Sequence, residues 1–364
     1  MIANKITHEK DLSLKIVTKL PENISKENEY IFSRRQEYTF PKLRVKKRKN
    51  IFLTHYGITL KNLLPIRRTL PNAWNFRNPN AGFIFHFYRK AIEVFLVCKY
   101  GKSLKTKTLD ADKQYLFAFS PWFGYFSWVT ESLPRIMKTI DKHAQLTLIL
   151  PESYAKKKFV NESLKLFPEL KQEIIPEGIH MHVPKITIPE LKPLTYVFNP
   201  DEMIAYRDFI WSKVENMKIN IKTFEKIYVS RSKAKNRKII NNEEVENIFR
   251  KFGFQILNFE DYSFFEQVYL MKHCKILGGV HGAGFANIAY MSDGSKLFEL
   301  IKEYSSYHEE RPSYWRLCSA LNIQYYIQYC KPKEYGNYDL WVGVDLKIDS
   351  NELNQNLFLV DNAK

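Results

Sequence analysis

Apolar runs and amphipathic stretches alternate most regularly in the second half of the chain. Short apolar runs rich in β-branched and aromatic residues predict strands at 226–230, 254–259, 275–279, 296–301 and 323–328. Amphipathic stretches predict helices at 201–215, 242–251, 263–274, 284–290 and 312–321. Because repeated strand–helix alternation builds a parallel sheet, the second half is predicted to bind its ligand beyond the carboxyl ends of its strands.

The first half is less regular, with aromatic and β-branched runs before its helical stretches. Strands are predicted at 83–88, 94–97, 115–119, 145–150 and 185–188, and helices at 124–141 and 155–166. Four prolines, at positions 184, 189, 193 and 200, then fall within one short stretch. Clustered prolines mark connecting chain, so we place the domain boundary near 189–200.

A glycine-rich turn carries the most informative pattern at the predicted ligand edge. The segment HGAG at 281–284 follows a buried strand and opens a helix that contains Asn287. Gly282 and Gly284 are expected to allow positive φ and close backbone approach, and Ala283 lies between them. Free N–H groups at the helix start favour an anion such as a diphosphate. The alternative is a turn that needs glycine only for packing, which the nearby His281 and Glu299 make less attractive.

The net charge of the chain favours a negatively charged ligand or partner. Among 364 residues, 56 Lys and Arg against 39 Asp and Glu give +17, which favours a polyanionic partner: nucleic acid, an anionic membrane surface or a phosphorylated small molecule. The 45% hydrophobic content excludes wholesale disorder. Four widely spaced cysteines exclude a disulfide scaffold or Cys-rich zinc module and fit a reducing compartment.

Signals for a membrane span, a leader peptide and a metal are weak. The first 20 residues have no apolar core, and no apolar run approaches the ~20 residues of a spanning helix, so we expect a soluble or peripheral protein. Asp110 and Asp112 have a metal-binding spacing, but a basic stretch precedes them and we interpret them as a turn. The histidines lack zinc-site spacing, and neither a P-loop nor a nucleophile elbow occurs. No metal and no cofactor are predicted.

A set of motifs in order resembles the core of glycosyltransferase family 61. These are YVSR at 228–231, Arg237 with NNE at 241–243, FEQ at 265–267, HGAG at 281–284 with Asn287, and FE at 298–299. An upstream segment at 124–135 is similar to the family's aromatic–His–Trp segment that ends in Leu-Pro-Arg. Ser127 stands where that segment usually has histidine. The resemblance covers about 115–300.

The resemblance implies an α/β, GT-B-like fold of two Rossmann-like domains with an interdomain cleft. Residues 1–195 would form the acceptor-binding domain with a basic N-terminal extension, and residues 196–345 the nucleotide-sugar-binding domain. A C-terminal helix within 346–364 would pack back on the first domain. The resemblance also implies a hexosyl or pentosyl transferase with a UDP-linked donor, an inverting mechanism and no obligatory metal.

An inverting transferase needs a base for the acceptor hydroxyl. Glu131, in the segment similar to the family's, is the predicted base, and the alternative is an exposed helix carboxylate. The neighbouring Trp122, Tyr125 and Trp128 are predicted to stack on acceptor sugar rings, and Arg135 completes this acceptor set. Ser127 leaves open an inactive homologue that serves as a binding partner.

Positive charge must also stabilise the leaving diphosphate. Arg231 ends a strand at the ligand edge, where its guanidinium fork suits phosphate, and the alternative is an ordinary surface arginine. Glu299 is predicted to accept hydrogen bonds from ribose hydroxyls, unless it is a strand-end surface charge. The predicted donor set is Arg231, Arg237, His281, Gly282, Ala283, Gly284, Asn287 and Glu299. Asn241 is interpreted as an N-cap, and Ser263 with Glu266 as a capping box.

The remaining charge lies mostly between Lys42 and Lys49, and it exceeds what one diphosphate needs. It suggests a cytoplasmic enzyme of surface polysaccharide synthesis on the inner, anionic leaflet of a membrane, with a glycan or lipid-linked glycan acceptor. The alternative interpretation of this run is a solvated surface stretch. A nucleic-acid-binding protein is a competing hypothesis for the whole chain, but no recognised module supports it, and we expect no nucleic acid partner.

Overall fold

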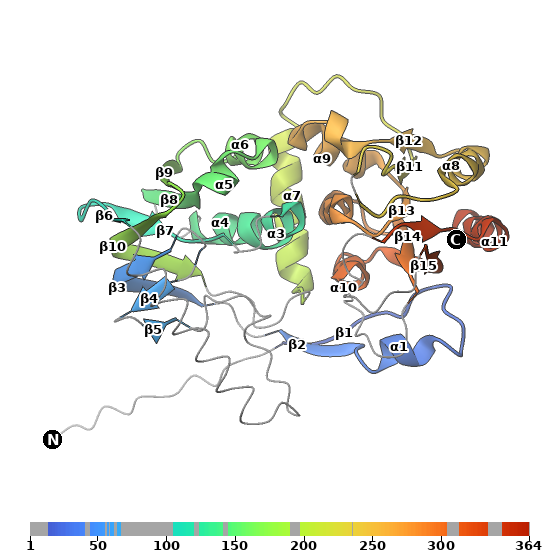
Figure 1. The fold of residues 1–364 in the computed structure, drawn as a ribbon, viewed down its shortest axis with the longest axis horizontal. Helices are drawn as coiled ribbons and strands as arrows, with labels where there is room; N and C mark the ends of the chain where they lie inside the picture. The colour runs from blue at the N-terminus through green and yellow to red at the C-terminus, as the bar shows by residue number, and fades with distance from the viewer. Residues whose placement is uncertain are drawn as a thin grey trace.

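The computed structural model describes residues 14–40, 44–54, 57, 59–61, 64–66, 105–119, 124–140, 145–189, 197–234, 236–303, 313–333 and 344–363. In these ranges the chain forms two large sheets that lie side by side, with helices packed around and between them (Figure 1). The strands predicted at 83–88 and 94–97 lie outside the described residues, as do Lys42 and Trp122. The fold is therefore mixed α/β.

The C-terminal sheet has the parallel architecture predicted from the sequence. Its order is β12-β11-β13-β14-β15-β16, and every neighbouring pair is parallel except β15 with β16. The strands are β11 (Lys226–Val229), β12 (Gln255–Leu257), β13 (Ile276–Val280), β14 (Lys296–Lys302), β15 (Gln324–Pro332) and β16 (Leu346–Lys347). Strand β13 is buried at all five positions, as expected for a parallel strand covered on both faces.

Helices of this half are α8 (Asn242–Lys251), α9 (Phe264–His273), the 3-10 helix η5 (Ala283–Tyr290) and α10 (Ser313–Ala320). The capping box of α9 is confirmed, because Ser263 Oγ accepts from Glu266 N at 3.3 Å and the Glu266 carboxylate accepts from Ser263 N at 2.7 Å. The N-cap interpretation of Asn241 is wrong in detail. Asn241 occupies the cap position of α8, but its amide nitrogen donates to the carbonyl of Ile348 instead of capping the helix.

The N-terminal sheet is mixed, with order β5-β4-β3-β10-β7-β8-β9, and β6 pairs with β10. Its strands are β3 (Val45–Leu53), β4 (Thr59–Lys61), β5 (Leu64–Pro65), β6 (Lys105–Thr108), β7 (Gln114–Leu116), β8 (Leu146–Pro151), β9 (Lys171–Ile175) and β10 (Ile179–Pro189). Strands β10, β7, β8 and β9 are parallel, whereas β3 and β4 are antiparallel. The strand predicted at 185–188 is too short because β10 runs through Pro184. The predicted turn at Asp110 is confirmed, since its carboxylate accepts from Asp112 N.

Helices connect the two sheets. Residues 125–140 form a continuous helical segment of α3 (Tyr125–Ser127), a π-helical turn η3 (Trp128–Ser132) and α4 (Leu133–Ile140). The short helices α5 (Glu152–Ala155) and α6 (Lys158–Leu164) follow β8. Helix α7 (Pro200–Val214) runs between the halves and contacts α4, α9, α10 and η5 (Figure 1). No helix in the described part of the chain is long and apolar enough to cross a membrane.

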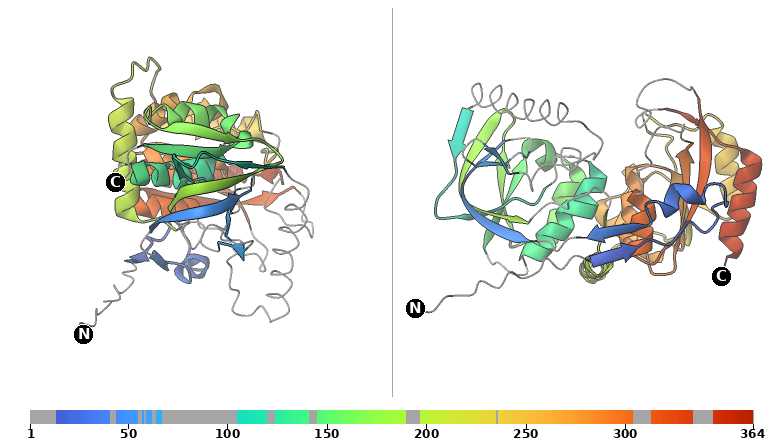
Figure 2. Two further views of the ribbon diagram at one scale, coloured as in Figure 1. Left: turned by 90° about the vertical axis from the view of Figure 1, so that its left-hand side faces the viewer. Right: turned by 90° about the horizontal axis from the view of Figure 1, so that it is seen from below.

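The two terminal segments pack on the C-terminal half. The hairpin of β1 (Leu14–Val17) and β2 (Glu37–Phe40), with α1 (Glu29–Ser33), lies beside this half (Figure 2). Trp315 Nε1 donates to the Lys19 carbonyl, and Arg316 donates to the Arg35 carbonyl at 2.8 Å. Residues 14–40, which the sequence assigned to the first domain, are thus held by the second half.

Helix α11 (Ser350–Asn362) packs against α8 and β15. Its buried face, formed by Leu353, Leu357 and Val360, belongs to the apolar cluster around Phe249 and Phe298 of the second sheet. The prediction that this helix packs back on the first domain is therefore wrong. The apolar face of α11 is already covered by the sheet that immediately precedes it in the chain.

Candidate donor and active site

Two arginines lie together beyond the carboxyl end of β11. Arg231 Nε donates to the Arg237 carbonyl at 3.2 Å, and its Nη2 donates to the Asn236 carbonyl at 2.9 Å. Arg237 Nη1 donates to the His281 carbonyl at 2.7 Å, and its buried Nε has no partner. Neither forms an ion pair with a described residue. Desolvation, with the nearby charge of Arg237, lowers the pKa of Arg231. The charge of Glu260 acts in the opposite direction, and the two arginines still exceed this one carboxylate, which favours binding of an anion.

The glycine turn packs directly against this arginine pair. Gly282 has an extended φ of −177°, and a Cβ there would collide with Arg231 Nη1. At Gly284 a Cβ would make ordinary 3.4 Å contacts with Phe259 and Val229. The predicted positive φ at Gly282 and Gly284 is therefore wrong; close approach of the guanidinium explains the first glycine. The first amides of η5, at Ala283 and Gly284, have no acceptor within their helix and can donate to an anion.

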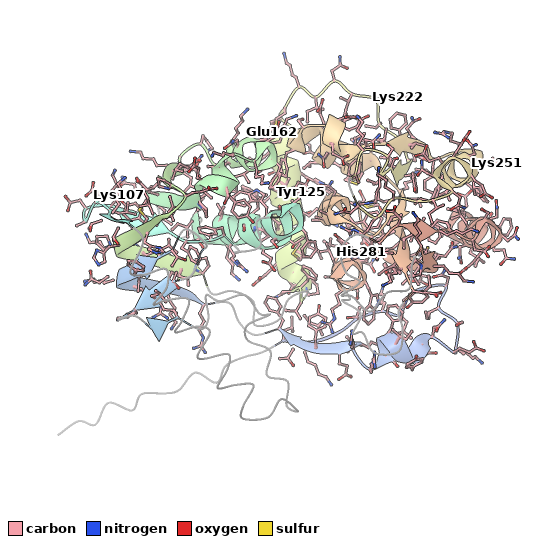
Figure 3. All side chains as sticks on the ribbon, viewed as in Figure 1. Lys107, Tyr125, Glu162, Lys222, Lys251 and His281 are labelled. Atoms are coloured by element: carbon pink, nitrogen blue, oxygen red, sulfur yellow. The ribbon has the colours of Figure 1, made fainter. Side chains whose placement is uncertain are left out.

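Arg231 and the glycine turn line a cavity of about 300 Å³ between the two halves of the protein. Gly282, Ala283 and Gly284 form one wall with Ser230, and Tyr125 and Phe159 close it from the first half. Its remaining lining includes four aromatic residues, two carboxylates and one lysine: Phe259, Tyr262, Phe264, Phe285, Glu162, Glu260 and Lys158. Figure 3 labels Tyr125 and Glu162 on the side of the first half that faces the second sheet. The volume lies at the lower end of the range typical of ligand sites.

Tyr125 also links the two halves. Its hydroxyl donates to Asn287 Oδ1 at 2.6 Å, and Asn287 Nδ2 donates to Gln267 Oε1 at 2.8 Å. Burial raises the pKa of the Tyr125 phenol, so the hydroxyl remains a donor. Asn287 is fully buried with its amide engaged, which contradicts its predicted role as a donor ligand. It holds η5 to α3 instead.

Glu299 has a different partner from the predicted one. Its Oε1 is 2.5 Å from His281 Nδ1, and its Oε2 accepts from the Tyr325 hydroxyl at 2.6 Å. The residue is only 2% exposed, so neither oxygen is left for a ribose hydroxyl. The ribose role is therefore contradicted. Desolvation, together with the Glu299 charge, raises the pKa of Tyr325, and the phenol stays a donor.

Glu131 lies apart from the donor cavity. It is buried in the π-helical turn, 9% exposed, with Arg135 Nη2 at 3.9 Å from its Oε2. The alternative of an exposed helix carboxylate is thus wrong. Both residues line a second cavity of about 570 Å³ between α4 and α7, which shares no lining residue with the first. Among the described residues, no hydrogen bond or ion pair joins Glu131 or Arg135 to the predicted donor residues.

Only one described aromatic residue of the predicted acceptor set reaches the donor cavity. Tyr125 lines it, whereas Trp128 is fully buried and donates from Nε1 to Ser163 Oγ at 2.8 Å. Trp128 is therefore a core residue and the stacking prediction for it is wrong. Trp122 lies outside the described residues.

The sequence did not identify several residues around the site. Glu162, Glu260 and Tyr262 line the donor cavity, and the hydroxyl of Tyr314 donates to the Gly282 carbonyl at 2.6 Å. These side chains come from α6, the segment before α9 and α10, far apart along the chain. No local spacing could have grouped them, because only tertiary packing does so.

A known family of glycosyltransferases shares the motifs that build this site. The family model described as Glycosyltransferase 61 matches residues 125–298, which contain the motifs from Tyr125 to Phe298. Over this region the chain is similar to glycosyltransferase family 61, and the resemblance of its motifs is confirmed. Among curated proteins none matches the chain.

Proposed function

We propose that this protein transfers a sugar from a UDP-linked donor to a glycan or lipid-linked glycan acceptor, with inversion and without a required metal. The observation that carries the proposal is the Arg231–Arg237 pair, which forms no ion pair within 4 Å with a described residue and packs against the Gly282–Gly284 turn. A diphosphate would supply charge-assisted acceptors for these two guanidinium groups. The aromatic walls of the cavity suit a nucleobase or a sugar ring.

Direct displacement explains why positive charge stands where the leaving group would lie. As the glycosidic bond to the diphosphate breaks, charge builds on the phosphate oxygens, and preorganised donors stabilise it. Two guanidinium groups and the first amides of η5 supply these donors. We propose that they take the place of a divalent cation, in a GT-B-like arrangement with donor and acceptor in the interdomain cleft.

Glu131, the base predicted from the sequence, is one of two candidates for the proton acceptor, and His281 is the other. The Glu131 carboxylate lines the α4–α7 cavity beside Arg135. As base, it would require the acceptor hydroxyl to approach from that side. This assignment is separable from the donor site, since the two cavities have different linings.

Strand β3 supports a second contact, with an anionic leaflet on the cytoplasmic face of a membrane. Lys46, Lys47, Arg48 and Lys49 have no ion-pair partner among the described residues, and Lys185 lies directly opposite Lys49 in the sheet. Like charges opposite each other destabilise a sheet, and an anionic surface offsets that cost at about 1 kcal/mol per basic residue. An acceptor carried by a membrane lipid would then be close to the enzyme.

A screen of UDP-sugars for hydrolysis or transfer tests the proposed activity, run with and without EDTA. We expect turnover of at least one donor that EDTA leaves unchanged, and full loss on chelation contradicts the metal-independent mechanism. UDP binding without turnover of any donor would favour an inactive homologue. Steeply salt-dependent binding to duplex DNA with no response to UDP would favour a nucleic-acid-binding protein.

A further inference from the structure

A row of three side chains ends at the donor loop. The Tyr325 hydroxyl donates to Glu299, and Glu299 accepts from Nδ1 of His281, the residue before the Gly282–Gly284 turn. Tyr325 and Glu299 come from neighbouring parallel strands, β15 and β14, and His281 follows β13. Residues from three adjacent strands thus hold the His281 imidazole in place. A carboxylate orients a catalytic histidine by the same kind of hydrogen bond.

The ring of His281 has one nitrogen left for chemistry. With Nδ1–H donating to Glu299, a neutral imidazole carries its lone pair on Nε2. The side chain is 22% exposed, whereas that of Glu299 is 2% exposed, so the row opens only at its histidine end. Its ring lies 5.1 Å from that of Tyr314, which is 5.6 Å from the ring of Phe126 in the first half. His281 therefore faces the junction between the halves (Figure 3).

We propose that His281 is the general base of the transfer and that Glu299 is its positioning residue. This rests on the proposed function. Nε2 takes the proton of the acceptor hydroxyl while the acceptor oxygen forms its bond to the anomeric carbon. The bond from that carbon to the diphosphate breaks, and its electron pair leaves with the nucleoside diphosphate. Glu299 stabilises the imidazolium that forms, and Tyr325 holds Glu299.

The place of His281 favours it over Glu131. His281 is bonded to the turn whose amides and arginine would hold the leaving group, and its carbonyl accepts from Arg237. Glu131 instead faces a buried arginine in a cavity that the donor loop does not line. A base must lie within hydrogen-bond reach of the acceptor while the donor is bound. Of His281 and Glu131, only His281 adjoins the turn that would hold the donor.

Single-turnover kinetics and UDP calorimetry on the full chain test this assignment. We expect His281→Ala to lower kcat about 10²–10⁴-fold, the range for a lost general base, with the UDP Kd within threefold of wild type. Glu299→Gln should lower kcat at least about tenfold with KM little changed, and Glu299→Asp should recover part of the loss, because a carboxylate restores the orientation of the ring. Glu225→Gln, at an exposed carboxylate just before β11, is the matched control.

Several outcomes would overturn the assignment. Full kcat in His281→Ala together with loss in Glu131→Gln would make Glu131 the base. Equal loss of UDP affinity and turnover would make His281 only a phosphate ligand. Absence of UDP binding by the wild type would instead contradict the proposed function. Failure of the His281 assignment and failure of the proposed function therefore give different results.

The unmodified protein provides a test that does not depend on whether the variants fold. Nitrogen NMR of the His281 imidazole should show the neutral tautomer with its proton on Nδ1. A proton on Nε2 of the neutral ring would contradict the hydrogen bond from His281 Nδ1 to Glu299.

Discussion

The two stretches that carry the family motifs differ in how far their polar groups are satisfied. Beyond β11 and β13, Arg231 and Arg237 donate hydrogen bonds only to carbonyl groups, and Arg231 lines a cavity. In the 125–140 segment, Trp128 is bonded to Ser163 and Glu131 faces Arg135. Because buried polar groups normally find partners, the charge left over at the first edge indicates binding. Motif residues whose polar groups already have partners within the protein indicate a structural role.

Substitution of Arg231 should have the largest effect on UDP binding. Charge-assisted hydrogen bonds are worth about 1.5–3 kcal/mol, so Arg231→Ala should weaken UDP binding by about 10–100-fold in calorimetry. Arg250→Ala, at an exposed arginine of α8 paired with Glu246, is the control and should leave the affinity unchanged. Unchanged UDP affinity in Arg231→Ala would place the diphosphate elsewhere.

Tyr125→Phe should show that the opposite edge of the cavity is structural. The change leaves Asn287 Oδ1 without its donor, and we expect a loss of about 1–3 kcal/mol in the free energy of unfolding, measured with urea. Tyr30→Phe, at an exposed tyrosine, should have no effect. Equal stability of the two variants would mean that the Tyr125–Asn287 bond contributes nothing to holding the halves together.

Alkaline titration follows from the same buried phenols. Burial raises the pKa of Tyr125, Tyr206 and Tyr228 above the ordinary value near 10. A group with a raised folded pKa gives its full stabilisation below the unfolded pKa and loses it as pH rises. The free energy of unfolding should therefore fall above about pH 10, with a smaller slope in Tyr125→Phe. A flat profile from pH 9 to 12 would contradict this burial.

Alanine substitutions of Gly282 and Gly284 should differ in their effect on UDP affinity, because the two glycines have different contacts. Gly282→Ala is expected to displace the Arg231 guanidinium and weaken UDP binding about tenfold, the lower end of the loss expected for Arg231→Ala. Gly284→Ala meets only ordinary contacts and should bind UDP within twofold of wild type. A larger loss in the second variant would show that the turn, and not Arg231, decides affinity.

The basic strand should give the smallest effect. Lys47→Glu is expected to weaken binding to vesicles containing anionic lipid by roughly fivefold, corresponding to about 1 kcal/mol. Lys251→Glu, on exposed α8, is the charge-matched control (Figure 3). Equal sedimentation of both variants, or salt-independent sedimentation of the wild type, would remove the membrane contact.

Sequence patterns predicted the second half well because its signals are local. Continuous apolar runs gave the parallel strands, and Ser263 with Glu266 gave the start of α9. The first half was harder, since β10 runs through a proline and the antiparallel strand β3 pairs with it from far away in the chain. The packing of residues 14–40 on α10 likewise has no local signature.

The candidate site was predicted in part for the same reason. Arg231 and the 281–284 turn follow strands whose ends meet at one edge, so the rule for parallel sheets groups them. The roles of Glu299 and Asn287 were wrong because their partners, Tyr325 and Tyr125, come from other elements. Motif residues show where a site lies; which atoms remain free depends on tertiary packing.

Comparative calorimetry of UDP and UMP on the wild type and on Arg231→Ala tests the central claim most directly. If Arg231 holds the diphosphate, UDP should bind the wild type at least about tenfold more tightly than UMP, and this difference should largely vanish in the variant. Equal affinity for the two nucleotides in the wild type, or an undiminished difference in Arg231→Ala, would contradict the proposed donor site.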